Sequence, residues 1–385
     1  MRLEPVAGDD VTAILPRLRA VLDGEGPALW LGMPDAAGPS TAATSGTATD
    51  AAPREAPEGT AVVVTTSGST GYPKSVVLSV AALRASASAT AARIGTGRWV
   101  LALPPGYVAG LQVIVRGLLA GTGPVVVPGP FDAGAFARAA AGASGPRYTS
   151  LVPAQLARLL DATGDPEVSA CLRGFETILV GGQALPAALR DRALEAGAHV
   201  VRTYGASETS GGCVYDGVPL DGVVVRTGEQ GEVQVSGPTL ATGYLGEPER
   251  TAAAFPVLDG VRWYRTGDTG RVVDGRVLVD GRIDNVIVSG GVNVSLDRVE
   301  RVVRALPGLA TAVVVGVEDA RWGEASVVVV PADAADTTSL DAVRTAVGAE
   351  LGPPARPARM VRLDEVPHLS SGKPDRVAIR HLLSV

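Results

Sequence analysis

A stretch rich in hydroxyl groups and glycine, closed by a lysine, is the first place in this sequence where chemistry is expected. Residues 65–74 read Thr-Thr-Ser-Gly-Ser-Thr-Gly-Tyr-Pro-Lys. Backbone N–H groups in glycine-rich turns form concave anion sites, and the hydroxyls and the lysine add further donors. The stretch therefore predicts a phosphate-binding loop, with an ordinary Gly/Ser turn as the alternative. The residues expected to contact phosphate are Thr66, Ser67, Gly68, Ser69, Thr70, Gly71 and Lys74.

The loop differs from the phosphate-binding loop of kinases and GTPases. That motif places its lysine directly after the second glycine and then continues into a helix. Here Tyr72 and Pro73 come before Lys74, and apolar runs lie on both sides of the loop. The pattern predicts a strand, the loop and a second strand.

Two later segments follow predicted strands and could contact a nucleotide. Gly181, Gly182 and Gln183 come directly after the apolar run 177–180. Ligands of α/β sheets bind at the carboxyl ends of strands, although a plain tight turn explains this segment equally well. Glu208 lies among hydroxyls and glycines after the next predicted strand. It suits a magnesium ion that bridges phosphates, and a solvated loop carboxylate is the alternative.

Two segments nearer the C-terminus could complete such a site. Asp268 could accept both hydroxyls of a ribose, assisted by Arg282, although each alone is more typical of a turn. Lys373 ends the sequence Ser-Ser-Gly-Lys and could reach a distant site. Most exposed lysines make no such contact.

Composition limits the kind of protein. The chain has 385 residues, a formal net charge of -6, 46% hydrophobic residues and two cysteines. The charge argues against a nucleic-acid partner, and two cysteines are too few for a disulfide framework. No apolar run approaches the ~18 residues of a membrane span, and no signal-peptide pattern is visible. The expectation is a cytoplasmic protein of one large domain or two.

The pattern of apolar residues predicts an α/β fold. A helix is expected at 11–22, and residues 34–59 form a low-complexity segment predicted to be flexible. Short apolar runs then alternate with helical ones, which favours a largely parallel sheet covered on both faces. The expected strands are 99–103, 125–127, 148–152, 177–180 and 199–202, and the expected helices are 80–94, 110–120, 135–141, 154–161 and 186–196.

From about residue 220 short strands and turns predict a small antiparallel region. The last hundred residues predict a separate α+β module with helices at 296–306, 340–351 and from 377, and strands at 311–317, 325–330 and 360–363. The boundary is expected at 281–284. The predicted domains are therefore residues 1–283 and 284–385.

Taken in order, these segments resemble the acyl-adenylating (AMP-forming) superfamily of acyl-CoA synthetases, adenylation domains and luciferases. The resemblance runs from about residue 61 to the C-terminus. Within it, the segments 101–112, 147–152 and 204–216 are most similar to the short actinobacterial o-succinylbenzoate–CoA ligases of menaquinone biosynthesis. The resemblance implies a large N-terminal ATP- and acyl-binding domain and a small mobile C-terminal lid. It also implies ATP, Mg²⁺ and coenzyme A, the last as a co-substrate.

The resemblance also assigns roles to residues. The loop up to Lys74 would cover the β- and γ-phosphates, and Gly181, Gly182 and Gln183 would border the adenine and the acid. Ser207 would contact the α-phosphate and Glu208 would hold magnesium, while Asp268 and Arg282 would bind the ribose. Lys373 would bridge the substrate carboxylate and the α-phosphate, and Asp284 would be the hinge. Members of the superfamily usually carry a histidine pair where this sequence has Gly106 and Tyr107, and a glycine at Ser75.

The acid is expected to lie near Tyr107, Tyr204 and Gly205. The expected reaction is AMP-forming ligation of 2-succinylbenzoate to coenzyme A, with only small molecules as partners. The alternatives are a ligase for another aromatic acid, an enzyme that loads a carrier protein, and a non-catalytic nucleotide sensor. Because Lys74, Glu208, Asp268 and Lys373 are all present, the sensor is disfavoured. The sequence does not indicate an oligomeric state.

Overall fold

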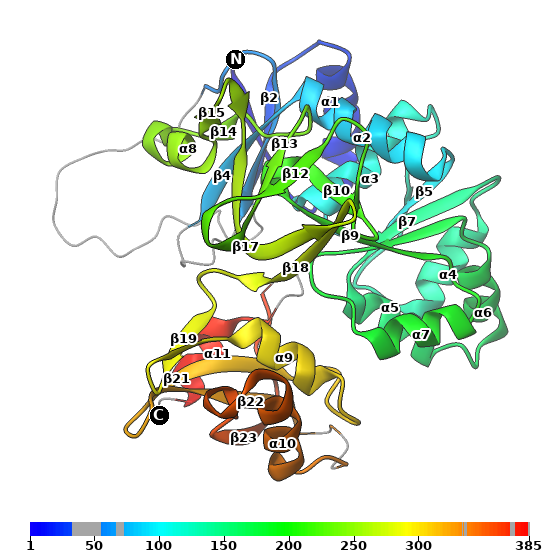
Figure 1. Ribbon diagram of the computed structural model, residues 1–385. Helices are drawn as coiled ribbons and strands as arrows, with labels where there is room; N and C mark the ends of the chain where they lie inside the picture. The colour runs from blue at the N-terminus through cyan, green and yellow to red at the C-terminus, as the bar shows by residue number, and fades with distance from the viewer. Residues whose placement is uncertain (33–54, 67–72, 333, 335–336, 370–373, 384–385) are drawn as a thin grey trace, which may run out of the picture. The chain divides into compact units, whose positions relative to one another are not determined.

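The computed structural model describes the chain except for residues 33–54, 67–72, 333, 335–336, 370–373 and 384–385 (Figure 1). It divides into two compact units. The first contains residues 1–182, 193–225 and 235–265, and the second contains residues 183–192, 226–234 and 266–385. Most of the segment predicted to be flexible, 34–59, lies outside the described residues. The domain boundary at 283/284 stays a prediction.

A five-stranded sheet in the first unit carries the phosphate loop. Its order is β1 (Leu3–Ala7), β2 (Ala28–Gly32), β3 (Thr60–Thr66), β4 (Lys74–Ser79) and β14 (Gly243–Tyr244). Strands β3 and β4 pair antiparallel, with Thr66 opposite Lys74. This confirms the predicted strand–loop–strand arrangement. Strands β1 and β2 were not predicted; they pair in parallel with each other, and β2 pairs in parallel with β3.

A seven-stranded sheet forms the rest of the first unit's framework. Its order is β11 (Val218–Pro219), β10 (Gly211–Tyr215), β9 (Val200–Ala206), β8 (Thr177–Val180), β7 (Arg147–Leu151), β5 (Arg98–Leu101) and β6 (Val125–Val126). The strands from β9 to β6 are parallel, as predicted, and β10 continues the sheet antiparallel to β9. Because parallel strands share a direction, β8 and β9 deliver the residues that follow them to one edge.

Helices connect these strands. They are α1 (Val11–Leu22), α2 (Val80–Ile94), α3 (Val108–Leu119), α4 (Ala133–Ala141), α5 (Pro153–Asp161), α6 (Pro166–Arg173), α7 (Ala187–Glu195) and α8 (Pro248–Ala254). Right-handed crossovers between parallel strands put α3 on one face of the seven-stranded sheet and α4 to α6 on the other. Helix α3 packs on β5, β7 and β10, and α4 packs on β6. The sheet is therefore covered on both faces, as predicted.

Residues 224–282 form two further sheets. The larger has four strands in the order β12 (Val224–Thr227), β13 (Glu232–Ser236), β17 (Tyr264–Val273) and β18 (Arg276–Arg282), and the smaller pairs β15 (Val257–Leu258) with β16 (Val261–Arg262). Strands β17 and β18 pair antiparallel, which confirms the predicted antiparallel region. The hairpin of β17 and β18 from Thr266 onward belongs to the second unit.

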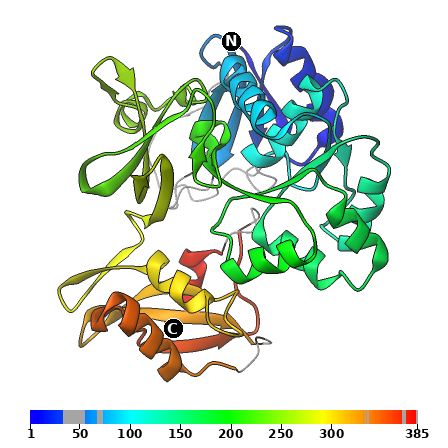
Figure 2. The same cartoon turned by 45° about the vertical axis from the view of Figure 1, so that its right-hand side comes forward.

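The C-terminal part of the second unit is an α+β module. Its sheet contains β19 (Val286–Ser289), β20 (Val292–Ser295), β21 (Val313–Asp319), β22 (Gly323–Pro331) and β23 (Arg359–Leu363), and its helices are α9 (Leu296–Arg304), α10 (Leu340–Leu351) and α11 (Arg376–Leu383). Helices α9 and α10 lie on the same side of the sheet in both views (Figures 1 and 2).

Successive valines of β21 and β22 point to opposite faces of this sheet, because side chains alternate along a strand. Val314 and Val328 pack in a cluster with α9 and α10, while Val315 and Val327 pack in a second cluster with Ile379 of α11. Burial on both faces explains the continuous apolar runs of these strands. Among the described residues, no helix is long and apolar enough to cross a membrane.

Candidate active site

Lys74 is positioned by the pleat of the first sheet. Tyr244 of β14 lies opposite Val76 of β4. Paired residues of an antiparallel ladder point to the same face, and so does the residue two positions before Val76, which is Lys74. The Nζ atom of Lys74 accordingly lies 5.6 Å from the centroid of the Tyr244 ring. The guanidinium of Arg250 lies 5.3 Å from the same ring.

Tyr244 links Lys74 to the predicted metal ligand. Its hydroxyl donates a hydrogen bond of 2.9 Å to Oε1 of Glu208, and both side chains are buried. Burial, reinforced by the negative charge of Glu208, raises the pKa of the Tyr244 hydroxyl above its ordinary value. The phenol therefore keeps its proton and remains a donor throughout the neutral pH range. The structure thus brings Lys74 to the ring and Glu208 to the hydroxyl of one side chain, although 134 positions separate them in the sequence.

Glu208 stands in a short 3₁₀ turn, Ser207–Thr209, that directly follows β9. The carbonyl of Ser210 after this turn accepts hydrogen bonds from Ser86 Oγ at 3.0 Å and from Gln112 Nε2 at 2.8 Å. Because helices α2 and α3 both anchor the turn, its two predicted ligands, Ser207 and Glu208, are held on rigid elements.

Close backbone packing explains the glycines around this turn. A Cβ atom on Gly205 would lie 2.1 Å from the carbonyl oxygen of Gly211, and one on Gly181 would lie 2.3 Å from Thr203 Oγ1. Gly182 has φ +80°, which side chains rarely adopt. Gly181 and Gly182 follow β8 at the edge where the Ser207 turn follows β9, as the sequence predicts. Gln183 comes next and falls in the second unit.

The segment that carries Gly106 and Tyr107 leads into α3. Tyr107 is the residue before the helix, and its backbone N–H donates to the carbonyl of Pro104 at 3.2 Å. Gly106 donates to the carbonyl of Gly8 at 2.6 Å. Tyr107 and Tyr204 are both partly buried. Their predicted contact with the acid stays a prediction.

A buried arginine on α3 was missed by the sequence analysis. Arg116 is 7% exposed, and its guanidinium lies 4.9 Å from the centroid of the Trp99 ring. Its Nη2 donates to the hydroxyl of Tyr215 at 3.4 Å, while Nε has no hydrogen-bond partner among the described residues. Burial lowers the pKa of the Arg116 guanidinium.

No carboxylate in the described part of the chain forms an ion pair with Arg116, and helix α3 contains no acidic residue. A buried cation without a counter-ion is costly. One turn earlier, Gln112 Oε1 is also buried, with no hydrogen-bond partner in the part of the chain that the structure describes. Arg116 therefore leaves an unmet donor and Gln112 an unmet acceptor on α3, and Gln112 lies beside the Ser207 turn. Arg116 is the one charged residue of α3, and that was the signal available in the sequence.

In the second unit, Asp268 and Arg282 lie opposite each other on β17 and β18. Arg282 Nη1 lies 3.4 Å from Asp268 Oδ1 and donates to the carbonyl of Thr266 at 2.9 Å. Its Nε and Nη2 donate to the two carboxylate oxygens of Asp284 at 3.0 and 3.1 Å. The structure therefore brings together the predicted ribose pair and the predicted hinge residue around one guanidinium.

Other predicted site residues lie outside the described part of the chain: Ser67, Gly68, Ser69, Thr70, Gly71 and Lys373. Thr66, at the end of β3, donates from Oγ1 to the carbonyl of Lys74 at 3.5 Å.

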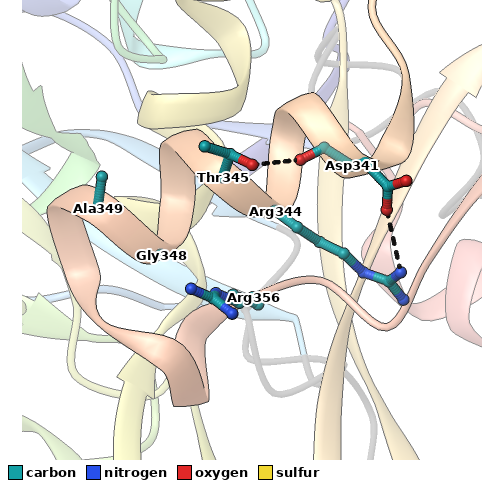
Figure 3. Close-up of a pocket in the computed structure, with 6 residues that line it drawn as sticks. All are labelled: Asp341, Arg344, Thr345, Gly348, Ala349 and Arg356. Carbon is teal, nitrogen blue, oxygen red and sulfur yellow. Dashed lines mark hydrogen bonds and ion pairs between the residues drawn. The ribbon is translucent and has the colours of Figure 1, made fainter.

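None of the predicted site residues lines a surface hollow that the structure shows in the second unit. It is lined by Asp341, Arg344, Thr345, Gly348, Ala349 and Arg356 (Figure 3). Arg344 is used structurally there, because it donates to the carbonyls of Pro357 and Ala358.

Comparison with known proteins gives concordant results. The family model described as AMP-binding enzyme matches residues 8–224, and the model of the AMP-binding enzyme C-terminal domain matches residues 298–373. A probable 2-succinylbenzoate–CoA ligase of Mycobacterium tuberculosis is 40% identical over 381 residues, which cover 97% of this chain and 96% of the relative. A 2-succinylbenzoate–CoA ligase of Bacillus cereus is 30% identical over 346 residues, which cover 83% of this chain and 70% of the relative.

Among solved structures, the o-succinylbenzoate CoA synthetase of Bacillus subtilis in complex with the acyl-adenylate intermediate is similar to this chain. It matches with a TM-score of 0.72 and 27% identity, over 83% of this chain and 69% of the other.

Proposed function

Since the chain belongs to the family of AMP-binding enzymes, we propose that it joins 2-succinylbenzoate to coenzyme A in an ATP-dependent, AMP-forming reaction through an acyl-adenylate. The relatives named above support both the reaction and the acid. This reaction would place the protein in menaquinone biosynthesis, in the cytoplasm. Its partners would be small molecules.

Arg116 is the observation that favours this acid. 2-Succinylbenzoate carries two carboxylates, of which one is activated and the other must be accommodated with its charge. A buried arginine that pairs with no carboxylate of the described residues fits that second group. We assign Arg116 to this end of the acid, and Tyr107, Tyr204 and Gly205 to its other contacts.

In the first step the substrate carboxylate attacks the α-phosphorus of ATP, and pyrophosphate leaves. Both reactants are anions, so alignment and charge screening lower the barrier more than covalent help does. Lys74 and the hydroxyl residues from Thr66 onward would hold the β- and γ-phosphates, and Ser207 the α-phosphate. Asp268 and Arg282 would fix the ribose. Lys373 would bridge the carboxylate and the α-phosphate.

The donor set fits magnesium. Glu208 is a single buried carboxylate, and the described residues contain no cluster of three or more metal-binding side chains. Mg²⁺ commonly uses one or two protein carboxylates and completes its shell with phosphate and water. When bound, the ion would screen phosphate charge; Glu208 would hold it, with Tyr244 fixing the carboxylate.

In the second step the thiol of coenzyme A attacks the adenylate carbonyl, AMP leaves, and a thioester forms. Lys373 must then withdraw, which motivates a C-terminal module at 284–385 that turns about Asp284.

The test is a panel of acids assayed by pyrophosphate release and by CoA-dependent AMP formation. It contains 2-succinylbenzoate, benzoate, a fatty acid and two mono-acids that each lack one carboxylate of 2-succinylbenzoate, namely 2-butanoylbenzoate and 4-oxo-4-phenylbutanoate. We expect turnover with 2-succinylbenzoate and little with the others. A preference for a simple aryl acid, or activity only with a carrier protein, would refute the assigned substrates.

Arg116→Met sharpens this test. Loss of a charged hydrogen bond of ~1.5–3 kcal/mol corresponds to a rise in KM for 2-succinylbenzoate of about 10- to 150-fold. For the mono-acid that retains the activated carboxylate, the kcat/KM, already low in the wild type, should hardly change. Arg158→Met, on the exposed surface of α5, is the control. Equal effects on the two acids would refute the role of Arg116.

A further inference from the structure

One carboxylate in the second unit contacts residues on both sides of Asp284. Asp297 Oδ2 accepts from the backbone N–H of Arg282 at 2.7 Å, and Oδ1 accepts from Asn285 Nδ2 at 2.7 Å. Asp297 lies in the first turn of α9, whereas Arg282 is the last residue of β18. The first contact therefore joins the segment before Asp284 to the segment after it.

The same carboxylate belongs to a charged network that extends to the C-terminal helix. Arg376 Nη2 lies 3.7 Å from Asp297 Oδ1 and donates to Glu300 Oε2 at 2.8 Å. Glu300, whose side chain is 9% exposed, also pairs with Arg304 at 2.9 Å. Arg376 follows Lys373 by three positions in the sequence. Asp297 thus connects the arginine assigned to the ribose with the base of the segment that carries the assigned lysine.

This contact also explains why the hairpin of β17 and β18 belongs to the same compact unit as the C-terminal module. Strand β18 packs on α9, and the hairpin of β17 and β18 falls in the same compact unit as the C-terminal module. A Cβ atom at Gly281 would lie 2.7 Å from Cβ of Asp297, so only glycine there allows the close approach.

We propose that Asp297 is a positioning residue that latches the hinge in the arrangement used for adenylation. The proposal rests on the proposed two-step function and on Asp284 as the hinge. Rotation at Asp284 moves Arg282 and Asp297 apart, because they lie on opposite sides of it, so the bond between them must break. The latched state holds Arg282 and the base of the Lys373 segment together, and only the first half-reaction needs both.

The chain contains its own matched control. Helices α9 and α10 both begin Ser-Leu-Asp, with Ser295 and Ser339 as N-caps, so Asp297 and Asp341 occupy equivalent positions. Both contribute the same favourable charge at a helix N-terminus. Asp341, however, is 93% exposed, and within the described residues its ion pair is with Arg344 of its own helix. A difference between Asp297→Ala and Asp341→Ala therefore isolates the tertiary contacts.

The experiment measures both half-reactions in full-length protein. Adenylation is followed by 2-succinylbenzoate-dependent ATP–pyrophosphate exchange, and thioester formation is followed from synthetic acyl-AMP and coenzyme A. We expect Asp297→Ala to slow adenylation about tenfold or more, the loss expected for a charge-assisted hydrogen bond. Thioester formation should change less than twofold, and Asp341→Ala should leave both rates unchanged. Equal losses in both half-reactions, or none, would overturn the latch.

A second readout does not depend on activity. Hydrogen exchange at the Arg282 amide should become at least tenfold faster in Asp297→Ala and stay unchanged in Asp341→Ala. Unchanged exchange would also refute the latch. Asp297→Asn keeps an acceptor for the Arg282 backbone amide but removes the charge facing Arg376. The Arg282 amide should therefore stay protected in this variant while adenylation slows. If the wild type forms no adenylate from any acid, the proposed function fails, and the exchange result still judges the latch.

Discussion

Replacing Tyr244 with phenylalanine tests the link between the phosphate lysine and the assigned metal ligand. The change keeps the ring, and with it the contacts to Lys74 and Arg250, but removes the 2.9 Å hydrogen bond to Glu208. A hydrogen bond to a charged group contributes ~1.5–3 kcal/mol, and the carboxylate left behind is only 6% exposed. We therefore expect Tyr244→Phe to lower the free energy of unfolding of the first unit by about 2 kcal/mol.

A double-mutant cycle tests whether the charge is responsible. Neutral hydrogen bonds are about half as strong as charge-assisted ones. In a Glu208→Gln background the same tyrosine change should therefore cost about 1 kcal/mol, which gives a coupling energy of about 1 kcal/mol.

The assay is urea unfolding at pH 7.5, followed by tryptophan fluorescence. Three of the four tryptophans, Trp30, Trp99 and Trp263, lie in the first unit, and Trp322 lies in the second. A Trp322→Phe background makes the signal specific for the first unit. A cost for Tyr244→Phe below about 0.5 kcal/mol, or an equal cost in both Glu208 backgrounds, would show that the bond lacks the strength of a charge-assisted one.

Three further outcomes are expected. Lys373→Ala should abolish adenylate formation but spare thioester formation from presynthesised acyl-AMP; equal loss in both assays would contradict a two-conformation mechanism. Burial raises the pKa of the Cys213 thiol from 9.0 to about 12, so between these pH values the unfolded chain releases a proton that the folded chain keeps. Because burial also raises the pKa of the Cys171 thiol to about 11, stability should fall between pH 8 and 10 in both proteins, but by about 1.4 kcal/mol more in wild type than in Cys213→Ala; parallel urea-unfolding profiles would exclude this cause. Gly205→Ala should cost ~1–3 kcal/mol by overpacking against Gly211, measured by thermal unfolding against Gly164→Ala, whose added methyl meets nothing within 4 Å; equal effects would rule out the clash.

Four elements were predicted to the residue, namely the helices 11–22, 80–94 and 340–351 and the strand 177–180. Helix 80–94 is capped by Ser79 and ends at Gly95, and helix 340–351 is capped by Ser339 and ends at Gly352. Capping hydroxyls and terminal glycines are encoded in a few adjacent residues, which is why a sequence reveals them. Helix α6 was missed, although Asp165 caps it and Pro166 begins it, because its eight residues bury few apolar side chains.

The site residues likewise divide into those that local sequence signals identify and those that depend on tertiary contacts. Glu208, Asp268 and Arg282 were found because each stands in a recognisable run of turn residues. Tyr244 was not found, since it belongs to a two-residue strand whose importance depends on pairing with β4. Arg116 was missed for a related reason: its missing counter-ion is a property of burial and of distant neighbours, which no local pattern records.

The pairing of Thr66 with Lys74 separates the length of the phosphate loop from the direction of its lysine. Residues added between the two paired positions would lengthen the loop and leave the Lys74 side chain on the face of Tyr244. A single residue inserted within β4, between Lys74 and Val76, would turn the lysine to the opposite face, because side chains alternate along a strand. The loop of this hairpin can therefore change in length, but an odd number of residues cannot be inserted into β4 between Lys74 and Val76 without turning the lysine away from Tyr244.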